Sequence, residues 1–262
     1  MTKTRFELNT ICLGRYEEGI REIPDATVDL ILTDPPYGVT DCAWDKRPDL
    51  AFMWSEFNRI LKERGAAVVM ATQPFATDLI AANRKHFRYD LIWAKSNPVG
   101  FLNAKRMPLR QHELVLVFYK KLPVYNPQML PAAHRVARAR SSKDGLARPG
   151  VYAAYKVIAH ESHARHPTSL LPVDKDGAGE GRHPTQKPLS LFEYLVRSYS
   201  NPGALVFDPF MGSGTTAVAA KRTGRHFIGA ELEAEYLAMA RARLGSVVFG
   251  EGATETLLPS LN

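Results

Sequence analysis

The sequence contains little cysteine and no long apolar run. Its 262 residues include only two cysteines, too few for a disulfide framework or, by themselves, for a tetrahedral zinc site. No segment approaches the roughly 20 apolar residues that a membrane-spanning helix needs. Residues 1–7 also lack the apolar core of a signal peptide. From these absences we expect a cytoplasmic protein that makes no membrane contact.

The pattern of a metal site is missing as well. Several histidines lie between His134 and His183, but none has a carboxylate partner at helical i, i+4 spacing. We expect no metal, and we interpret these histidines as solvated loop side chains or contacts to phosphate.

Positive charge is in excess, and most of it lies in one segment. The net charge is +7, and eleven lysines and arginines against five acids lie between Lys121 and Lys187. Such a segment suits a polyanion, because each neutralised phosphate releases counterions. A solvated loop with a basic bias explains the charge equally well.

Two parts of the chain alternate between strand and helix patterns. Apolar, β-branched runs that predict strands are followed by segments with apolar residues at helical spacing. The predicted strands cover residues 28–33, 66–71, 89–93, 112–119, 204–207 and 226–230, and the predicted helices cover residues 50–63, 75–83, 188–201, 215–222 and 234–244. Strands separated by helices predict βαβ units and a mostly parallel, doubly wound α/β sheet of the Rossmann-like type.

Residues 122–182 break this alternation. Six prolines and the glycine-rich run 177–181 prevent long regular elements there. We therefore expect one domain made of residues 1–121 and 183–245, a loop-rich insertion at 122–182, and a poorly ordered tail at 246–262.

A glycine-rich segment between a predicted strand and helix has the features of a cofactor-binding turn. Glycines let the backbone approach a ligand closely, and free N–H groups at a helix N-terminus bind a carboxylate. Glu231 ends the next predicted strand, where an acid can accept hydrogen bonds from both hydroxyls of a ribose. The pattern is not the Gly-x-Gly-x-x-Gly of dinucleotide enzymes, so S-adenosylmethionine is favoured over NAD; a turn needed only for packing is the simpler alternative. The segment comprises Asp208, Pro209, Phe210, Gly212, Ser213, Gly214, Thr215 and Thr216.

A second turn, Asp34-Pro35-Pro36-Tyr37, follows the predicted strand 28–33. The prolines stiffen it and fix the Asp34 carboxylate. The exocyclic amine of adenine or cytosine is conjugated with its ring and is a weak nucleophile. Asp34 and the Pro35 carbonyl can accept its two N–H bonds and favour a tetrahedral nitrogen, while Tyr37 stacks on a base flipped out of the duplex. A purely structural turn is the alternative.

These two turns together resemble the β-class DNA amino-methyltransferases, which include adenine enzymes of bacteria and their phages. The resemblance covers residues 28–128 and 183–244, and the catalytic turn precedes the cofactor turn, as in the circularly permuted order of that class. A third motif, residues 183–188, resembles the family segment that enters the helix over the methionine end of the cofactor. The resemblance implies cofactor contacts from Thr185, Gln186, Lys187 and Pro188, with the lysine pairing with the cofactor carboxylate; a capped helix start is the alternative.

The resemblance also implies contacts with double-stranded DNA. Residues 93–98, with Lys95 and Asn97, resemble the segment that lines the target-base pocket, and the insertion 122–182 takes the place of the target-recognition region. One departure is Gly14-Arg15, where relatives often carry an acid near the cofactor's adenine; Glu17 is a possible replacement. The other candidate DNA contacts are Lys105, Arg106, Arg110, Arg135, Arg138 and Arg140, which are alternatively surface charges.

We therefore expect a site-specific methyltransferase that transfers a methyl group from S-adenosylmethionine to N6 of a flipped-out adenine in duplex DNA. N4-cytosine methylation and methylation of a protein glutamine amide are alternatives, as is an inactive DNA-binding partner subunit. By family habit, and from the apolar residues between Phe101 and Met107, we expect a homodimer in a bacterial cell, encoded by the host, a phage or a prophage.

Overall fold

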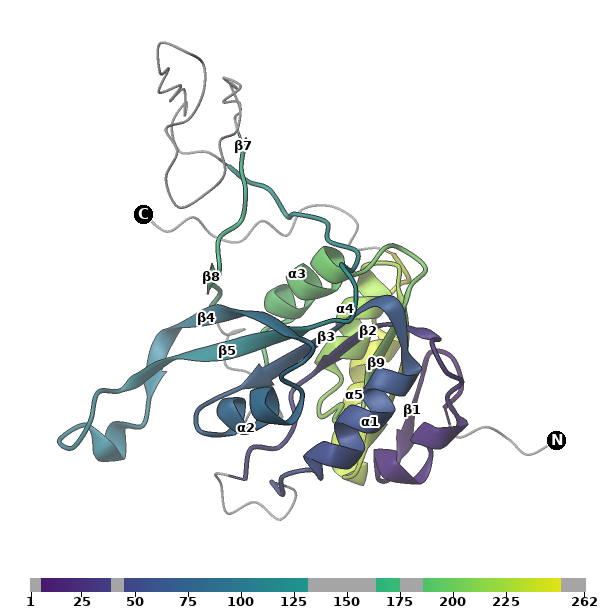
Figure 1. The fold of residues 1–262 in the computed structure, drawn as a ribbon, viewed down its shortest axis with the longest axis horizontal. Coiled ribbons are helices and arrows are strands. Elements are labelled where there is room, and N and C mark those ends of the chain that lie inside the picture. The colour runs from purple at the N-terminus through teal and green to yellow at the C-terminus, as the bar shows by residue number, and fades with distance from the viewer. Residues whose placement is uncertain (1–5, 39–44, 132–163, 175–185, 251–262) are drawn as a thin grey trace, which may run out of the picture.

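An eight-stranded mixed sheet forms the centre of the computed structural model, which describes residues 6–38, 45–131, 164–174 and 186–250 (Figure 1). Five neighbouring strands, from β1 to β3 in the spatial order, run parallel, whereas β5 runs antiparallel to both β3 and β4. In spatial order the strands are β1 (Thr10–Leu13), β10 (His226–Glu231), β9 (Leu205–Asp208), β2 (Val28–Thr33), β3 (Leu61–Ala71), β5 (Arg110–Phe118), β4 (Phe87–Val99) and β8 (Leu170–Pro172). The sheet thus confirms the predicted mostly parallel α/β class.

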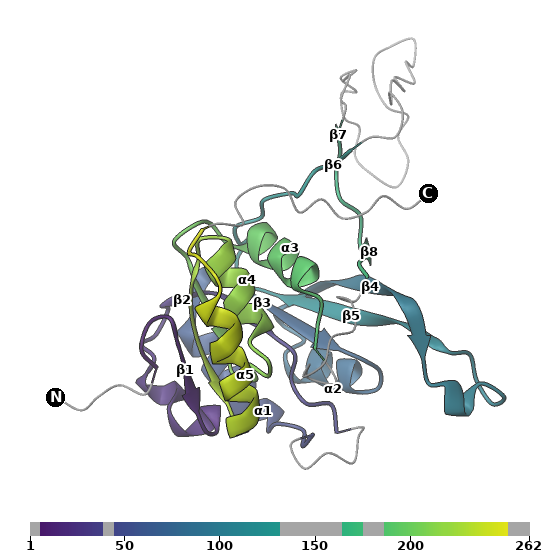
Figure 2. The same cartoon turned by 180° about the vertical axis from the view of Figure 1, so that it is seen from behind.

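Helices cover both faces of this sheet. Helices α3 (Leu189–Tyr199), α4 (Thr215–Arg222) and α5 (Ala234–Gly245) lie on one face (Figure 2), and α1 (Leu50–Ile60) and α2 (Phe75–Ala82) lie on the other (Figure 1). The short helices η1 (Tyr16–Glu18) and η2 (Ile20–Glu22) pack on the α1 side. Successive strand residues point to opposite faces, so Leu30 and Leu32 enter the core under α3, whereas Ile31 enters the core under α1. The continuous apolar run of β2 is therefore buried on both sides.

The boundary between α1 and β3 differs from the prediction. Asp49 caps α1 by accepting from the backbone N–H groups of Ala51 and Phe52, but the helix ends at Ile60 rather than at residue 63. Leu61 already pairs with Val28, and the register shifts between Val28 and Leu30. Gly65 lies inside β3 beside this irregularity, where a Cβ atom would come within 2.8 Å of the Asp29 carbonyl oxygen. The glycine therefore permits a close strand approach and does not end a helix.

Strands β4 and β5 form a ribbon that extends beyond the sheet (Figure 1). Both are longer than predicted, and a short helix, η3 (Phe101–Asn103), connects them after Gly100, which adopts a left-handed conformation. Because β4 runs in the same direction as β2 and β3, the ribbon leaves the sheet at the carboxyl edge of the parallel strands.

Part of the predicted insertion belongs to the sheet. Strand β8 pairs with β4 in parallel, and β6 (Leu130–Pro131) pairs with β7 (Ala164–Arg165) in a separate two-stranded sheet. The Trp93 indole N–H also donates to the Val173 carbonyl at 2.8 Å. Residues 164–174 are thus anchored to the sheet, whereas most of the insertion and residues 251–262 lie outside the described residues.

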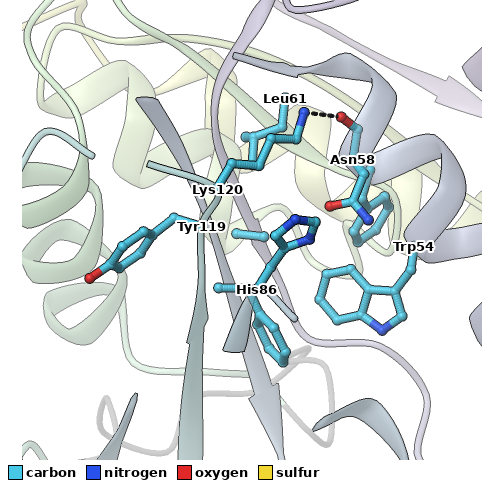
Figure 3. A pocket seen from close by; sticks show the side chains of 9 residues that line it. Trp54, Asn58, Leu61, His86, Tyr119 and Lys120 are labelled. Carbon is cyan, nitrogen blue, oxygen red and sulfur yellow. Dashed lines mark hydrogen bonds between the residues drawn. The ribbon is translucent and has the colours of Figure 1, made fainter. Parts of the chain in front are cut away.

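A recess between α1 and the strand ends lies near the amino edge of β3 (Figure 3). Trp54 and Phe118 close it with their rings 4.5 Å apart, and the Lys120 ammonium bridges its rim by donating to the Asn58 carbonyl at 2.5 Å. Side chains fill this recess, and the predicted functional motifs follow the opposite ends of the strands.

Candidate active site

The predicted motifs converge on the carboxyl edge of the parallel strands. Asp34 follows β2, the cofactor turn follows β9 and Glu231 ends β10. Because β10, β9 and β2 are adjacent and parallel, these groups meet on one edge, where open α/β sheets bind their ligands. The chain order of the motifs is therefore irrelevant to their proximity.

Asp208 ties the two turns together. Its carboxylate accepts from the Thr33 hydroxyl at 2.6 Å, the Thr216 hydroxyl at 2.5 Å and the Phe210 N–H at 3.0 Å. Burial raises the pKa of Asp208 to about 6, and these three hydrogen bonds partly oppose that rise. These hydrogen bonds join the cofactor turn to the end of β2.

Glu231 stands beside the same turn. Its carboxylate accepts from the N–H groups of Gly212 at 2.6 Å and Glu233 at 2.8 Å, and burial raises its pKa. Gly212 has a positive φ of 53°, and a Cβ atom there would meet no protein atom within 4 Å. Open space in front of Gly212, next to a fixed carboxylate and the N-terminus of α4, fits a cofactor with a ribose and a carboxylate.

Residues of α5 contact the remaining residues of the turn. Arg243 of α5 donates to the Ser213 carbonyl at 2.7 Å and to the Thr215 hydroxyl at 3.1 Å. Gly214 is the left-handed N-cap of α4 and lies against Ala240 of α5. At the adjacent edge strand, Arg15 pairs with Glu17 at 3.0 Å, just beyond the point where Leu13 lies opposite Glu231.

The Asp34 turn is fixed by side chains on both sides. Asp34 accepts from the Tyr37 hydroxyl at 2.5 Å and keeps 23% of its side-chain surface exposed, so a ligand can reach it. Pro35 is buried, and the Arg47 guanidinium donates to the Tyr37 carbonyl at 2.8 Å. The Tyr37 ring lies 5.7 Å from the Phe75 ring of α2. Pro36 completes this stiff turn.

A chain of ion pairs links Asp34 to the ribbon. The Lys187 ammonium contacts one Asp34 oxygen and lies 3.6 Å from Glu113 of β5, and Glu113 also pairs with Lys95 of β4. Burial raises the pKa of Asp34, whereas the Lys187 charge lowers it. Burial lowers the pKa of Lys187, but the carboxylates of Asp34 and Glu113 outweigh burial and raise it. The sequence analysis assigned no role to Glu113.

The predicted DNA contacts fall into three groups. Lys95, predicted in the segment that lines the target-base pocket, is buried and paired with Glu113. Asn97, Lys105, Arg106 and Arg110 are exposed along the ribbon. Arg135, Arg138 and Arg140 lie outside the described residues.

The third motif leads into α3. Gln186 is partly exposed, Lys187 is turned toward Asp34, and Pro188 is the N-cap of the helix. Thr185 lies outside the described residues. Within the described part of the chain, no helix has the length and apolar character to cross a membrane. No cluster of metal-ligating side chains occurs there either.

Comparisons with known proteins agree with this geometry. A family model described as DNA methylase matches residues 28–242. The chain belongs to this family. It is 30% identical to the type II methyltransferase M.HinfI of Haemophilus influenzae, covering 92% of this chain and 69% of that protein. It is also 30% identical to the DNA adenine methyltransferase YhdJ of Escherichia coli K12, covering 92% and 85% respectively.

Solved structures of methyltransferases have a similar fold. A complex titled M1.HpyAVI–SAM superimposes with a TM-score of 0.61 at 25% identity, covering 90% of this chain and 98% of the other. The cytosine-N4-specific PvuII DNA methyltransferase superimposes with a TM-score of 0.64 at 18% identity, covering 89% and 85%. The protein is a DNA methylase with a Rossmann-like α/β fold, and its cofactor is S-adenosylmethionine.

Proposed function

We propose that this DNA methylase transfers a methyl group to N6 of adenine in duplex DNA, with Asp34 as the acceptor that orients the amine. The observation that carries the proposal is the Asp34 carboxylate, partly exposed at the sheet edge and joined through Thr33 to the cofactor turn. The similarity to an adenine methyltransferase over most of both chains supports adenine as the base.

The bound cofactor supplies an electrophilic methyl group on a sulfonium. Asp34 and the Pro35 carbonyl accept the two N–H bonds of the target amine and direct the nitrogen lone pair toward the methyl carbon. As the new N–C bond forms, the S–C bond breaks and its electron pair stays on sulfur. The methylated nitrogen then loses a proton to Asp34, which passes it to solvent. A placed acceptor of this kind is commonly worth on the order of 10²–10³ in rate.

The other residues of the two turns hold the reactants. Tyr37 stacks on a base that has been flipped out of the duplex, while its hydroxyl keeps Asp34 in position. Glu231 accepts hydrogen bonds from the cofactor ribose, and the N-terminus of α4 with Gly212 to Thr216 binds the cofactor's charged end. Thr185, Gln186 and Pro188 are predicted to contact the methionine side of the cofactor, and Lys187 is the predicted contact of its carboxylate.

The deciding experiment identifies the methylated base. The protein is expressed in a host without DNA methylation, and the digested DNA is examined by nucleoside mass spectrometry and modified-base sequencing. We expect N6-methyladenine at one sequence motif. N4-methylcytosine without N6-methyladenine would refute the choice of base, and absence of both with intact cofactor binding would favour the partner-subunit alternative.

We also propose that residues 122–182 recognise the target sequence. Their charge supports this, and the anchored residues 164–174 connect them to the strand that carries Lys95. Replacing Arg135, Arg138 and Arg140 with alanine should weaken DNA binding and flatten its salt dependence by up to about three units. Unchanged affinity and slope would mean that recognition lies elsewhere.

A homodimer in the cytoplasm completes the proposal. Phe101 and Leu102 at the ribbon tip are 81% and 99% exposed, and Met107 is 59% exposed, which is unusual for large apolar side chains and suits a second copy of the chain. Serine at both Phe101 and Leu102 should convert the protein to monomers in light scattering. A wild-type protein that is monomeric at micromolar concentration and fully active would contradict this.

A further inference from the structure

Four charged side chains from four separate segments form one row of ion pairs, in which three are buried and Asp34 is partly exposed. Lys95 of β4 pairs with Glu113 of β5, Glu113 lies 3.6 Å from the Lys187 ammonium, and Lys187 contacts Asp34. Lys95, Glu113 and Lys187 retain only 5–10% of their side-chain surface. Two cations and two anions alternate, so the four side chains together carry no net charge. Burying an unpaired charge is costly, and alternation of opposite charges offsets part of that cost.

The strand register explains why these groups meet. Glu113 lies directly opposite Trp93 in the β4–β5 pair, and Lys95 is two residues farther along β4, so all three point to the same face of the sheet. Trp93 belongs to the core that packs under α3, and Lys187 lies in the segment leading into that helix. The Lys95 ammonium also lies 5.0 Å from the centre of the Trp93 ring. Packing of α3 therefore places Lys187 between Asp34 and Glu113.

We propose that Glu113 and Lys95 are positioning residues, which hold the Lys187 ammonium against Asp34 and balance its charge during methyl transfer. This inference rests on the proposed role of Asp34. The Lys187 charge keeps Asp34 ionised so that it can accept the N–H bond of the amine. The negative charge of Glu113 partly compensates the Lys187 charge, so that Asp34 remains basic enough to take the proton after methyl transfer. Lys95 acts through Glu113 by keeping it ionised.

This arrangement predicts opposite pH effects for two substitutions. The groups that face Asp34 are Lys187, Glu113, Tyr37 of its own turn and Asp208 of β9. Burial raises the pKa of Asp34 and the Lys187 charge lowers it. Lys187→Met removes that charge, so the pKa of Asp34 should rise and the acidic limb of the rate profile should move to higher pH. Glu113→Gln removes a repelling charge, which lowers the pKa of Asp34 and moves the limb to lower pH.

The experiment measures the methylation rate of duplex DNA against pH at saturating S-adenosylmethionine. Lys187→Arg keeps the charge and should leave the limb near its wild-type position, whereas Lys187→Met should move it. Glu193→Gln is the matched control, because Glu193 is also a buried acid paired with a cation, Arg222. It should leave the profile unchanged. Circular dichroism and urea unfolding show that each variant is folded.

A double substitution tests the role of Lys95. If Lys95 acts only through Glu113, Lys95→Met should have little further effect on the pH profile of a Glu113→Gln protein, although it changes the profile of the wild type. Equal effects of Lys95→Met in both backgrounds would overturn that part of the proposal.

Other outcomes are equally clear. An unmoved acidic limb in both Lys187→Met and Glu113→Gln would overturn the proposal. So would a Lys187→Met enzyme whose only defect is a raised KM for S-adenosylmethionine, because Lys187 would then serve the cofactor carboxylate alone. Failure of the proposed function looks different: Asp34→Asn would then remain active in the same assay.

Discussion

Replacing Gly214 with alanine should damage both the stability of the protein and its binding of cofactor. Gly214 has a φ of 81°, and an added Cβ atom would lie 2.7 Å from the Ala240 Cβ and 3.0 Å from the Ala240 Cα of α5. Gly203 is a matched control, because it has a φ of 79° and a Cβ atom there would meet nothing within 4 Å. The two substitutions share the backbone strain and differ in the contact with α5.

The comparison of the two variants gives the expected losses in the free energy of unfolding. Left-handed backbone costs a non-glycine residue about 1–2 kcal/mol, which both variants bear. Overpacking adds about 1–3 kcal/mol, which only Gly214→Ala bears, because the helix backbone behind Ala240 cannot yield easily. Relief of the contact displaces the N-terminus of α4, so the cofactor should also bind more weakly to Gly214→Ala but not to Gly203→Ala.

Urea denaturation gives the free energies of unfolding, and calorimetric titration gives the affinity for S-adenosylmethionine. A third protein carries Gly214→Ala together with Ala240→Gly, which removes the nearest contacting atom and should recover part of the lost stability despite the cost of a glycine in α5. Equal stability losses for Gly214→Ala and Gly203→Ala would refute the reasoning, because the α5 contact would then contribute nothing.

Three further predictions concern the site and the ribbon. Asp34→Ala should lower turnover by on the order of 10²–10³ while calorimetry shows unchanged cofactor affinity; near-normal turnover would exclude its proposed role. Replacing Lys105, Arg106 and Arg110 with alanine should reduce the salt slope of DNA binding by about one unit per lost phosphate contact, and an unchanged slope would make them bystanders. Because burial raises the pKa of Asp208 from 3.8 to about 6, the folded state binds a proton more tightly than the unfolded state. The stability of the wild type relative to Asp208→Asn should therefore increase as the pH falls through this window, by on the order of 3 kcal/mol; a pH-independent difference in urea unfolding would contradict this.

The motifs that lie within a few residues of each other could be predicted from the sequence. An aspartate after a buried strand and a glycine-rich turn before a helix each depend on local backbone geometry, and both were placed correctly at the carboxyl edge of the sheet. The end of α1 was predicted too late, because a glycine shortly after a helix usually marks its C-terminus. Gly65 instead lies within β3, beside the register shift between β2 and β3.

The ion-pair chain could not be predicted in the same way. Lys187 and Asp34 are 153 residues apart, and Glu113 appears in the sequence as one charged residue near the start of the predicted strand 112–119. Their contact depends on the β4–β5 register and on the packing of α3, which no short motif encodes. For the same reason the sequence did not reveal that Lys95 is buried and paired with Glu113.

The connection between the two turns depends on one short link. Thr33, the last residue of β2, donates to Asp208, the last residue of β9, and Asp34 follows Thr33 directly. Neighbouring strands lie about 4.8 Å apart, so this link sets the separation between the amine acceptor and the cofactor turn with the rigidity of the sheet itself. Methyl transfer requires the reacting atoms to be held about 3 Å apart and in line, and a small displacement is costly in rate. Because strand pairing supplies this spacing, the order of the two motifs along the chain can be permuted without moving the groups that react.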